Sequence, residues 1–115
     1  MAVAALANQL SPPGPAQSIA AAKPGGGAAV AGEATLIKAP YVRVVAVATA
    51  ADSVTLPLTY GGDSILVFND GVASMNVFGF GGATINGAAS VAQGAALGAL
   101  YVSSIEGTWH RFLQG

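Results

Sequence analysis

Residues 64–82 read S-I-L-V-F-N-D-G-V-A-S-M-N-V-F-G-F-G-G, which is the strongest strand signal in the chain. Two runs rich in β-branched and aromatic residues, 64–68 and 74–80, flank the triplet Asn69-Asp70-Gly71. Asn, Asp and Gly tolerate the positive φ angles that a tight chain reversal needs. The pattern predicts a β-hairpin that reverses at residues 69–71. Because this hairpin would hold three of the four phenylalanines, we expect it at the centre of the core.

Further strands are predicted on both sides of this stretch. They cover residues 33–38, 41–49, 53–56, 83–85, 99–105 and 108–113, and the alanine- and glycine-rich residues 88–98 are read as irregular chain or weak strand. Pro57 ends one strand, and Asn86-Gly87 and Glu106-Gly107 are turn signals. Turn signals that recur every ~8–12 residues are typical of an all-β domain. We therefore expect a compact β-sandwich or barrel of short antiparallel strands.

The first forty residues have a different composition from the rest. Ser11-Pro12-Pro13-Gly14-Pro15 favours extended backbone, Lys23-Pro24-Gly25-Gly26-Gly27 is a flexible break, and no aromatic residue precedes Tyr41. The sequence thus predicts an extended Ala/Pro/Gly-rich arm over residues 1–40 and a β module over residues 41–115.

Charge is scarce in this chain of 115 residues. Charged residues make up 8% of it, against roughly 25% in an average soluble domain, and the net charge is −1. So few charges protect poorly against self-association, which predicts a subunit of an assembly; an alanine-rich composition inherited from a GC-rich genome is the alternative. A basic stripe for nucleic acid and an apolar run of ~18 residues for a membrane span are both missing from the sequence.

Reactive groups are equally scarce. The chain has one histidine, His110, and no cysteine, and no G-x-S-x-G or phosphate-loop motif occurs. The carboxylates Asp52, Asp63, Asp70 and Glu106 each stand beside a predicted turn, where they accept backbone N–H bonds. We expect no catalytic residue, no cofactor and no metal site. Most aromatic side chains are assigned to the core, with Tyr60 and Trp109 the best candidates for partial exposure because each has a polar atom to satisfy.

A series of short signatures resembles a module of bacteriophage virion proteins. The signatures are Asp52-Ser53-Val54-Thr55-Leu56-Pro57, then Gly61-Gly62-Asp63, Ile65-Leu66-Val67-Phe68-Asn69-Asp70-Gly71, Val77-Phe78-Gly79, Gly82-Ala83-Thr84-Ile85-Asn86-Gly87 and Gly107-Thr108-Trp109. Their order is similar to that in small head-decoration, head-fibre and tail-fibre proteins, with Gly79 where a proline is common. The resemblance covers a little over half of the chain. It implies an all-β unit that trimerises and decorates a phage particle, and it brings no catalytic residue.

These observations lead to an expected function. The protein would be a non-enzymatic capsid decoration (cement) protein, a homotrimer on the outer surface of the phage head that bridges major capsid subunits, with the arm gripping the shell. A head- or tail-fibre or spike subunit that binds host-surface glycans is the second hypothesis. A small cytoplasmic enzyme or ligand-binding domain is the third, and it would be a monomer with a polar pocket.

Overall fold

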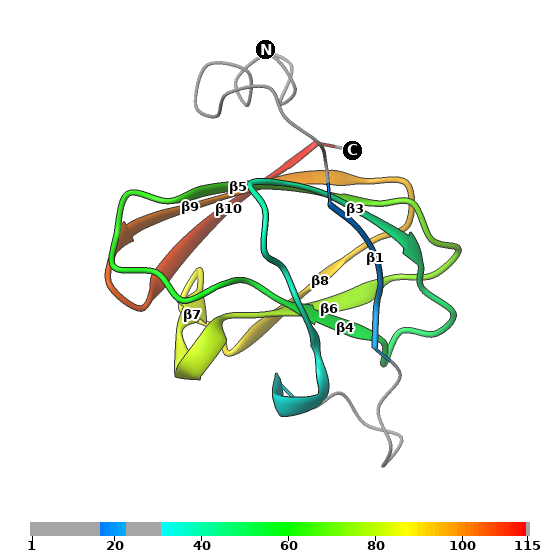
Figure 1. Ribbon diagram of the computed structural model, residues 1–115, viewed down its shortest axis with the longest axis horizontal. Helices are drawn as coiled ribbons and strands as arrows, with labels where there is room; N and C mark the ends of the chain where they lie inside the picture. The colour runs from blue at the N-terminus through cyan, green and yellow to red at the C-terminus, as the bar shows by residue number, and fades with distance from the viewer. Residues whose placement is uncertain (1–16, 23–30, 115) are drawn as a thin grey trace.

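The computed structural model describes residues 17–22 and 31–114, which form two β-sheets that face each other (Figure 1). Sheet A contains, in spatial order, β1 (Gln17–Ala20), β3 (Tyr41–Ala46), β5 (Ser64–Asn69), β9 (Gly98–Ile105), β10 (Thr108–Gln114) and β7 (Thr84–Ile85). Sheet B contains β2 (Thr35–Leu36), β4 (Ser53–Thr55), β6 (Met75–Phe78) and β8 (Ser90–Gln93). Two 3₁₀ turns, η1 (Ala31–Glu33) and η2 (Phe80–Gly82), complete the elements. The all-β prediction is confirmed, and no helix in the described residues is long and apolar enough to span a membrane.

The first six strands wind like a solenoid. Successive strands alternate between the sheets, so that β1, β3 and β5 pair in parallel in sheet A and β2, β4 and β6 pair in parallel in sheet B. Gln17 lies opposite Val42, and Tyr41 lies opposite Leu66, with the same separation along the chain in both cases. The prediction of an antiparallel sandwich or barrel is therefore wrong for this half of the molecule, where each strand finds its partner one winding away.

The predicted hairpin at residues 69–71 is also wrong. β5 belongs to sheet A and β6 to sheet B, so the intervening turn carries the chain from one sheet to the other. None of its residues has a positive φ angle. Gly71 is needed for another reason, because a Cβ atom there would lie 2.6 Å from Val47 of the preceding winding. The turn residues were recognised correctly, but they serve close packing between windings instead of a reversal within one sheet.

The last third of the molecule is mostly antiparallel, although β7 pairs in parallel with β10. β9 pairs with β5 and β10, and β8 pairs with β6. The turn predicted at Asn86-Gly87 is confirmed, with φ angles of 52° and 83°, and so is the turn at Glu106-Gly107 between β9 and β10. Glu106-Gly107 closes a hairpin between the paired strands β9 and β10, whereas Asn86-Gly87 reverses the chain between β7 of sheet A and β8 of sheet B. Both reversals are local, so turn signals in the sequence suffice to predict them.

The core between the sheets is mainly aliphatic. Its buried members include Ile37, Val42, Val44, Val54, Leu56, Met75 and Val77, with Tyr101 and Trp109 as the large aromatics. The stretch 64–82 does contribute to the core, through the buried Ile65, Val67, Met75 and Val77. Its phenylalanines do not, because Phe68 and Phe78 are only half-buried and Phe80 is exposed. Trp109 is fully buried, against the prediction of partial exposure, whereas the exposed Tyr60 confirms it. Two large aromatic side chains, Trp109 and Tyr101, lie in the core, whereas Tyr60, Phe80 and Phe112 are exposed.

Parts of the predicted arm belong to the two sheets. Gln17–Ala20 is the edge strand β1, and its Ile19 packs against the core. Thr35–Leu36 forms β2, and Ile37 is fully buried. Residues 1–16 and 23–30 of the arm lie outside the described residues.

Candidate interaction surface

The outer face of sheet A carries a continuous group of apolar side chains. Along β5 and β9, alternate residues point to the core, as Val67 and Tyr101 do, and the others point away from it. The strand registers place Tyr41, Leu66, Leu100 and Phe112 opposite one another across four strands. Phe68 and Val102 extend this row on the same face. We call these six residues the apolar face.

Two of these side chains are already buried by their neighbours. Leu66 and Leu100 are 1% and 3% exposed, and they pack with Tyr41, Phe68 and Val102 in a cluster separate from the core. The Tyr41 and Phe68 rings lie 6.2 Å apart, centroid to centroid, at 34°. Phe112 remains 57% exposed. The apolar face therefore forms a packed layer with an open flank at β10.

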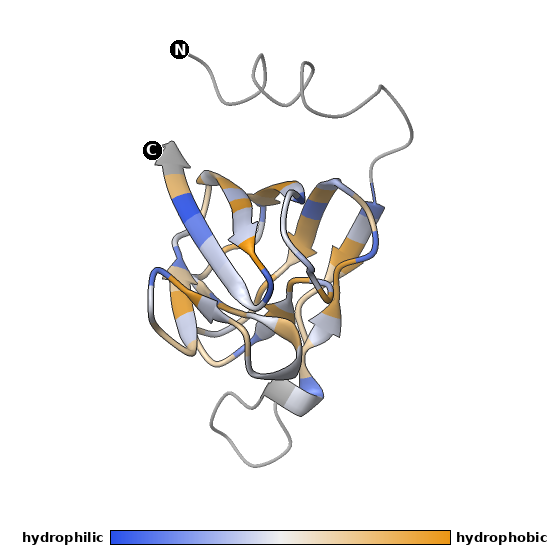
Figure 2. Ribbon diagram, turned by 90° about the vertical axis from the view of Figure 1, so that its left-hand side faces the viewer, coloured by the Kyte–Doolittle hydropathy of each residue, from blue (hydrophilic) through white to orange (hydrophobic). Residues whose placement is uncertain are grey.

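The outer face of sheet B has a different composition. The registers there align Thr55 with Phe78 and Ser90, and Ser53 with Asn76 and Ala92. Phe78 is the one large apolar side chain in these two rows; Ser53 and Thr55 are buried, and Ala92 is exposed. Figure 2 shows that hydrophobic residues are distributed along strands of both sheets, while a strongly hydrophilic band interrupts the strand leading to the C-terminus. The two outer faces of the molecule are thus chemically unequal.

An ion pair lies beside the apolar face. Arg43 Nε lies 2.7 Å from Asp70 Oδ2, and both side chains are partly exposed. With Tyr41 and Phe68 they line a shallow depression of about 290 Å³. An exposed pair of this kind adds little stability, but it neutralises both charges at the edge of the apolar face.

The titratable residues singled out in the sequence are dispersed. His110 is exposed, points away from buried Trp109 as expected for neighbours on a strand, and lies 3.1 Å from the Ser104 hydroxyl through Nε2. Asp52 accepts hydrogen bonds from the Ala48 amide and the Thr49 hydroxyl, at 2.8 and 3.0 Å, which confirms its role at a turn. Within the described residues, the acidic and histidine side chains form no group of three able to hold a metal ion.

A buried polar network connects β5, β8 and β9, and no motif in the sequence predicts it. The Tyr101 hydroxyl donates to Gln93 Oε1 at 2.8 Å, and Gln93 Nε2 donates to the Val67 and Leu97 carbonyls. Asn69 Nδ2 donates to the Ala73 and Gln93 carbonyls at 2.9 Å, and its Oδ1 accepts from the Gly71 amide. Burial raises the pKa of Tyr101 well above its ordinary value, and nearby Arg111 only partly offsets this. The network fixes the corner between the sheets and has no open position for a ligand.

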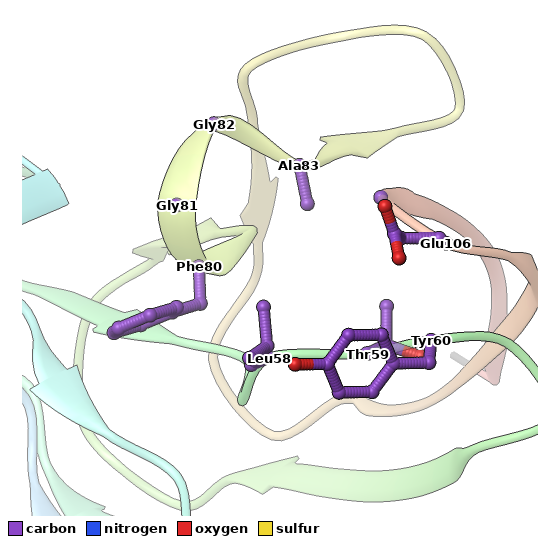
Figure 3. A pocket seen from close by; sticks show the side chains of 9 residues that line it. Leu58, Thr59, Tyr60, Phe80, Gly81, Gly82, Ala83 and Glu106 are labelled. Atoms are coloured by element: carbon purple, nitrogen blue, oxygen red, sulfur yellow. The ribbon is translucent and has the colours of Figure 1, made fainter.

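A small pocket lies where three loops meet, beyond the ends of β9 and β10 (Figure 3). It has a volume of about 250 Å³ and is lined by Leu58, Thr59, Tyr60, Phe80, Gly81, Gly82, Ala83, Glu106 and Gly107. We call it the loop pocket. Gly81 and Gly82 of η2 lie here, with φ angles of 67° and 87°.

Comparison of the chain with protein-family models, curated proteins and solved structures finds no match. Functional inference therefore depends on the surfaces just described and on the sequence signatures.

Proposed function

We propose that the protein is a structural virion subunit, a capsid decoration protein that associates with copies of itself, as a homotrimer, and covers the outer surface of a phage head. The observation that carries this proposal is the apolar face, a packed hydrophobic layer on the side of sheet A that faces away from the core. Contiguous apolar surface of this kind is typical of sites where proteins meet other proteins. The low charge content and the resemblance to phage virion modules support the same conclusion.

The mechanism is mechanical. Each subunit covers apolar surface on its copies and on the major capsid protein, and the area buried opposes separation of the shell subunits. Residues 1–16 precede β1, which is the edge strand of sheet A next to β3. We propose that the segment before this edge strand binds a neighbouring shell subunit, where an extended segment adds to an exposed strand edge.

The proposal is tested by binding of the purified chain to capsids that lack it. A chain without residues 1–16 keeps β1 in its sheet, so it should remain folded and self-associated while its binding to capsids is lost. Removal of residues 1–30 would be less informative, because it also deletes β1. Retention of capsid binding by the chain without residues 1–16 would refute the gripping role of the arm.

Copy number separates decoration from the second hypothesis, a fibre or spike subunit. A decoration protein should be comparable in abundance to the major shell protein on a stained gel of purified particles, whereas a fibre or spike subunit should be far scarcer. The specific feature that favours a glycan-binding role is the loop pocket.

A further inference from the structure

The loop pocket is built on a braced loop. Thr59 is buried, and its hydroxyl donates to Asp63 Oδ2 at 2.6 Å and lies 2.7 Å from the Ser103 hydroxyl of β9. The Ser103 hydroxyl also accepts from the Asp63 amide. Because Thr59 is anchored inward, its neighbours Leu58 and Tyr60 project outward, with exposed fractions of 52% and 73%. The pocket wall is therefore positioned before any ligand arrives, which lowers the entropic cost of binding.

The chemistry of the walls is mixed. Figure 3 shows the Leu58 side chain and the Tyr60 ring across the pocket from Ala83, with the Glu106 carboxylate beside them. Phe80, 44% exposed, adds a second aromatic surface at the rim. Glu106 and the Tyr60 hydroxyl take part in none of the hydrogen bonds found among residues 17–22 and 31–114. A ligand that fits must therefore offer an apolar surface and hydroxyl donors together.

We propose that the loop pocket binds one pyranose ring of a neutral sugar. The C–H groups on one face of a pyranose carry partial positive charge and pack against the negative face of an aromatic ring such as Tyr60. The hydroxyls at the edge of the sugar donate to the Glu106 carboxylate in charge-assisted hydrogen bonds. The volume of about 250 Å³ is below the range of about 300–1,000 Å³ of sites for drug-sized ligands, which suits a single ring.

The charge of the side chains that line the loop pocket narrows the class of ligand further. Glu106 is the acidic side chain of the pocket, and no basic side chain among the described residues lines it, so phosphates and acidic sugars find no oppositely charged partner there. A cation would gain little, because Glu106 is exposed and its attraction for a cation is screened by water and salt. The aromatic and aliphatic walls still require a ligand with an apolar face. A neutral sugar meets both conditions.

The test is a titration of the full ¹⁵N-labelled chain, followed by amide chemical shifts. The probes are methyl α-D-glucopyranoside, methyl α-D-mannopyranoside, methyl β-D-galactopyranoside and N-acetylglucosamine. At least one sugar should shift the amides of Tyr60, Gly81 and Gly107 and saturate in the millimolar range. Tyr60→Ala should weaken that binding about tenfold or more, the loss of most of the stacking surface. Glu106→Gln should weaken it less, because the amide oxygen still accepts a hydrogen bond without a full charge.

The matched control is Val72→Ala, which trims a side chain 89% exposed outside the loop pocket and should leave the affinity unchanged. The spectra report folding of each variant directly, and Glu106→Gln provides a surface substitution that should fold even if Tyr60→Ala does not. The inference is overturned if no sugar shifts these amides, if Tyr60→Ala binds as well as the wild type, or if tetramethylammonium chloride saturates the pocket and the sugars do not. None of these results depends on capsid binding or on the apolar face, so this inference and the proposed function fail separately.

Discussion

The outer faces of the two sheets differ in the kind of surface that they present. The apolar face of sheet A packs two leucines, two phenylalanines, a tyrosine and a valine together on the side opposite the core. The corresponding rows of sheet B contain serine, threonine, asparagine and alanine with Phe78 as the one large apolar side chain, and Ser53 and Thr55 there are buried. Both sheets bury their inner faces in one common core, so the fold does not need a second hydrophobic layer. This difference is our reason for proposing that other copies of the chain cover the outer face of sheet A and not that of sheet B.

The largest expected effect is on folding stability within the apolar face. Leu100→Ala removes a side chain that is 3% exposed, and should lower the free energy of unfolding by about 2–4 kcal/mol. Ala92→Ser, on the outer face of sheet B, is exposed and should change it by no more than about 0.5 kcal/mol. Urea denaturation followed by fluorescence of the buried Trp109 measures both. If the two substitutions lowered the free energy of unfolding equally, the claim that the two outer faces differ in packing would be contradicted.

A second prediction concerns the corner that carries the chain from sheet A to sheet B. Asn69→Ala leaves the Ala73 and Gln93 carbonyls without their amide donor in a buried site, and should cost about 1–3 kcal/mol. Asn76→Ala is the matched control, since Asn76 Nδ2 donates to one carbonyl, that of Ala50, in a more exposed setting. Asn76→Ala should lower the free energy of unfolding by less than Asn69→Ala does in the same urea denaturation experiment. A larger loss for Asn76 would mean that the corner is held by other contacts.

The third prediction compares the two faces of a single strand, because Tyr101 points inward beside the outward-pointing Leu100. The unfolded chain releases the Tyr101 proton near pH 10, whereas the folded chain retains it because burial raises the Tyr101 pKa. The contribution of Tyr101 to stability should therefore be constant below pH 10 and fall above it by about 1.4 kcal/mol per pH unit. Tyr101→Phe should lose this part of the alkaline decline, even though it is less stable at neutral pH. Parallel pH profiles of the two proteins would contradict the assignment.

The sequence predicts the antiparallel third of the molecule well and the solenoid-like part poorly, for a physical reason. At Asn86-Gly87 and Glu106-Gly107 the turn residues adopt, at three of the four positions, the positive φ angles that their types allow. Both turns reverse the chain locally, between Ile85 and Ala88 in one case and between β9 and β10 in the other. At Asn69 and Gly71 the same residue types serve a side-chain cap and a close approach to Val47. Nothing local distinguishes these two uses, because the partner strand lies a full winding away.

The candidate surfaces could likewise be predicted from the sequence only in part. Exposure of Tyr60 follows from its need to hydrate a polar atom, and it was predicted. The apolar face could not be predicted, because the assignment of Tyr41, Leu66 and Phe112 to one row depends on registers between strands that are distant in sequence. The fully buried Gln93 carries no sequence signal, since its place is set by the Tyr101 hydroxyl and two carbonyls that meet only in the folded chain.

Sedimentation equilibrium of the full-length wild type and of Phe112→Ser, with Ala92→Ser as the control, tests the role of the apolar face most directly. The wild type and the control should sediment as a trimer, and Phe112→Ser should shift toward the monomer because it replaces the most exposed side chain of the apolar face with a polar one. A wild type that remains monomeric at every concentration, or a Phe112→Ser variant that associates as strongly as the wild type, would contradict the proposal that sheet A is covered by other copies of the chain.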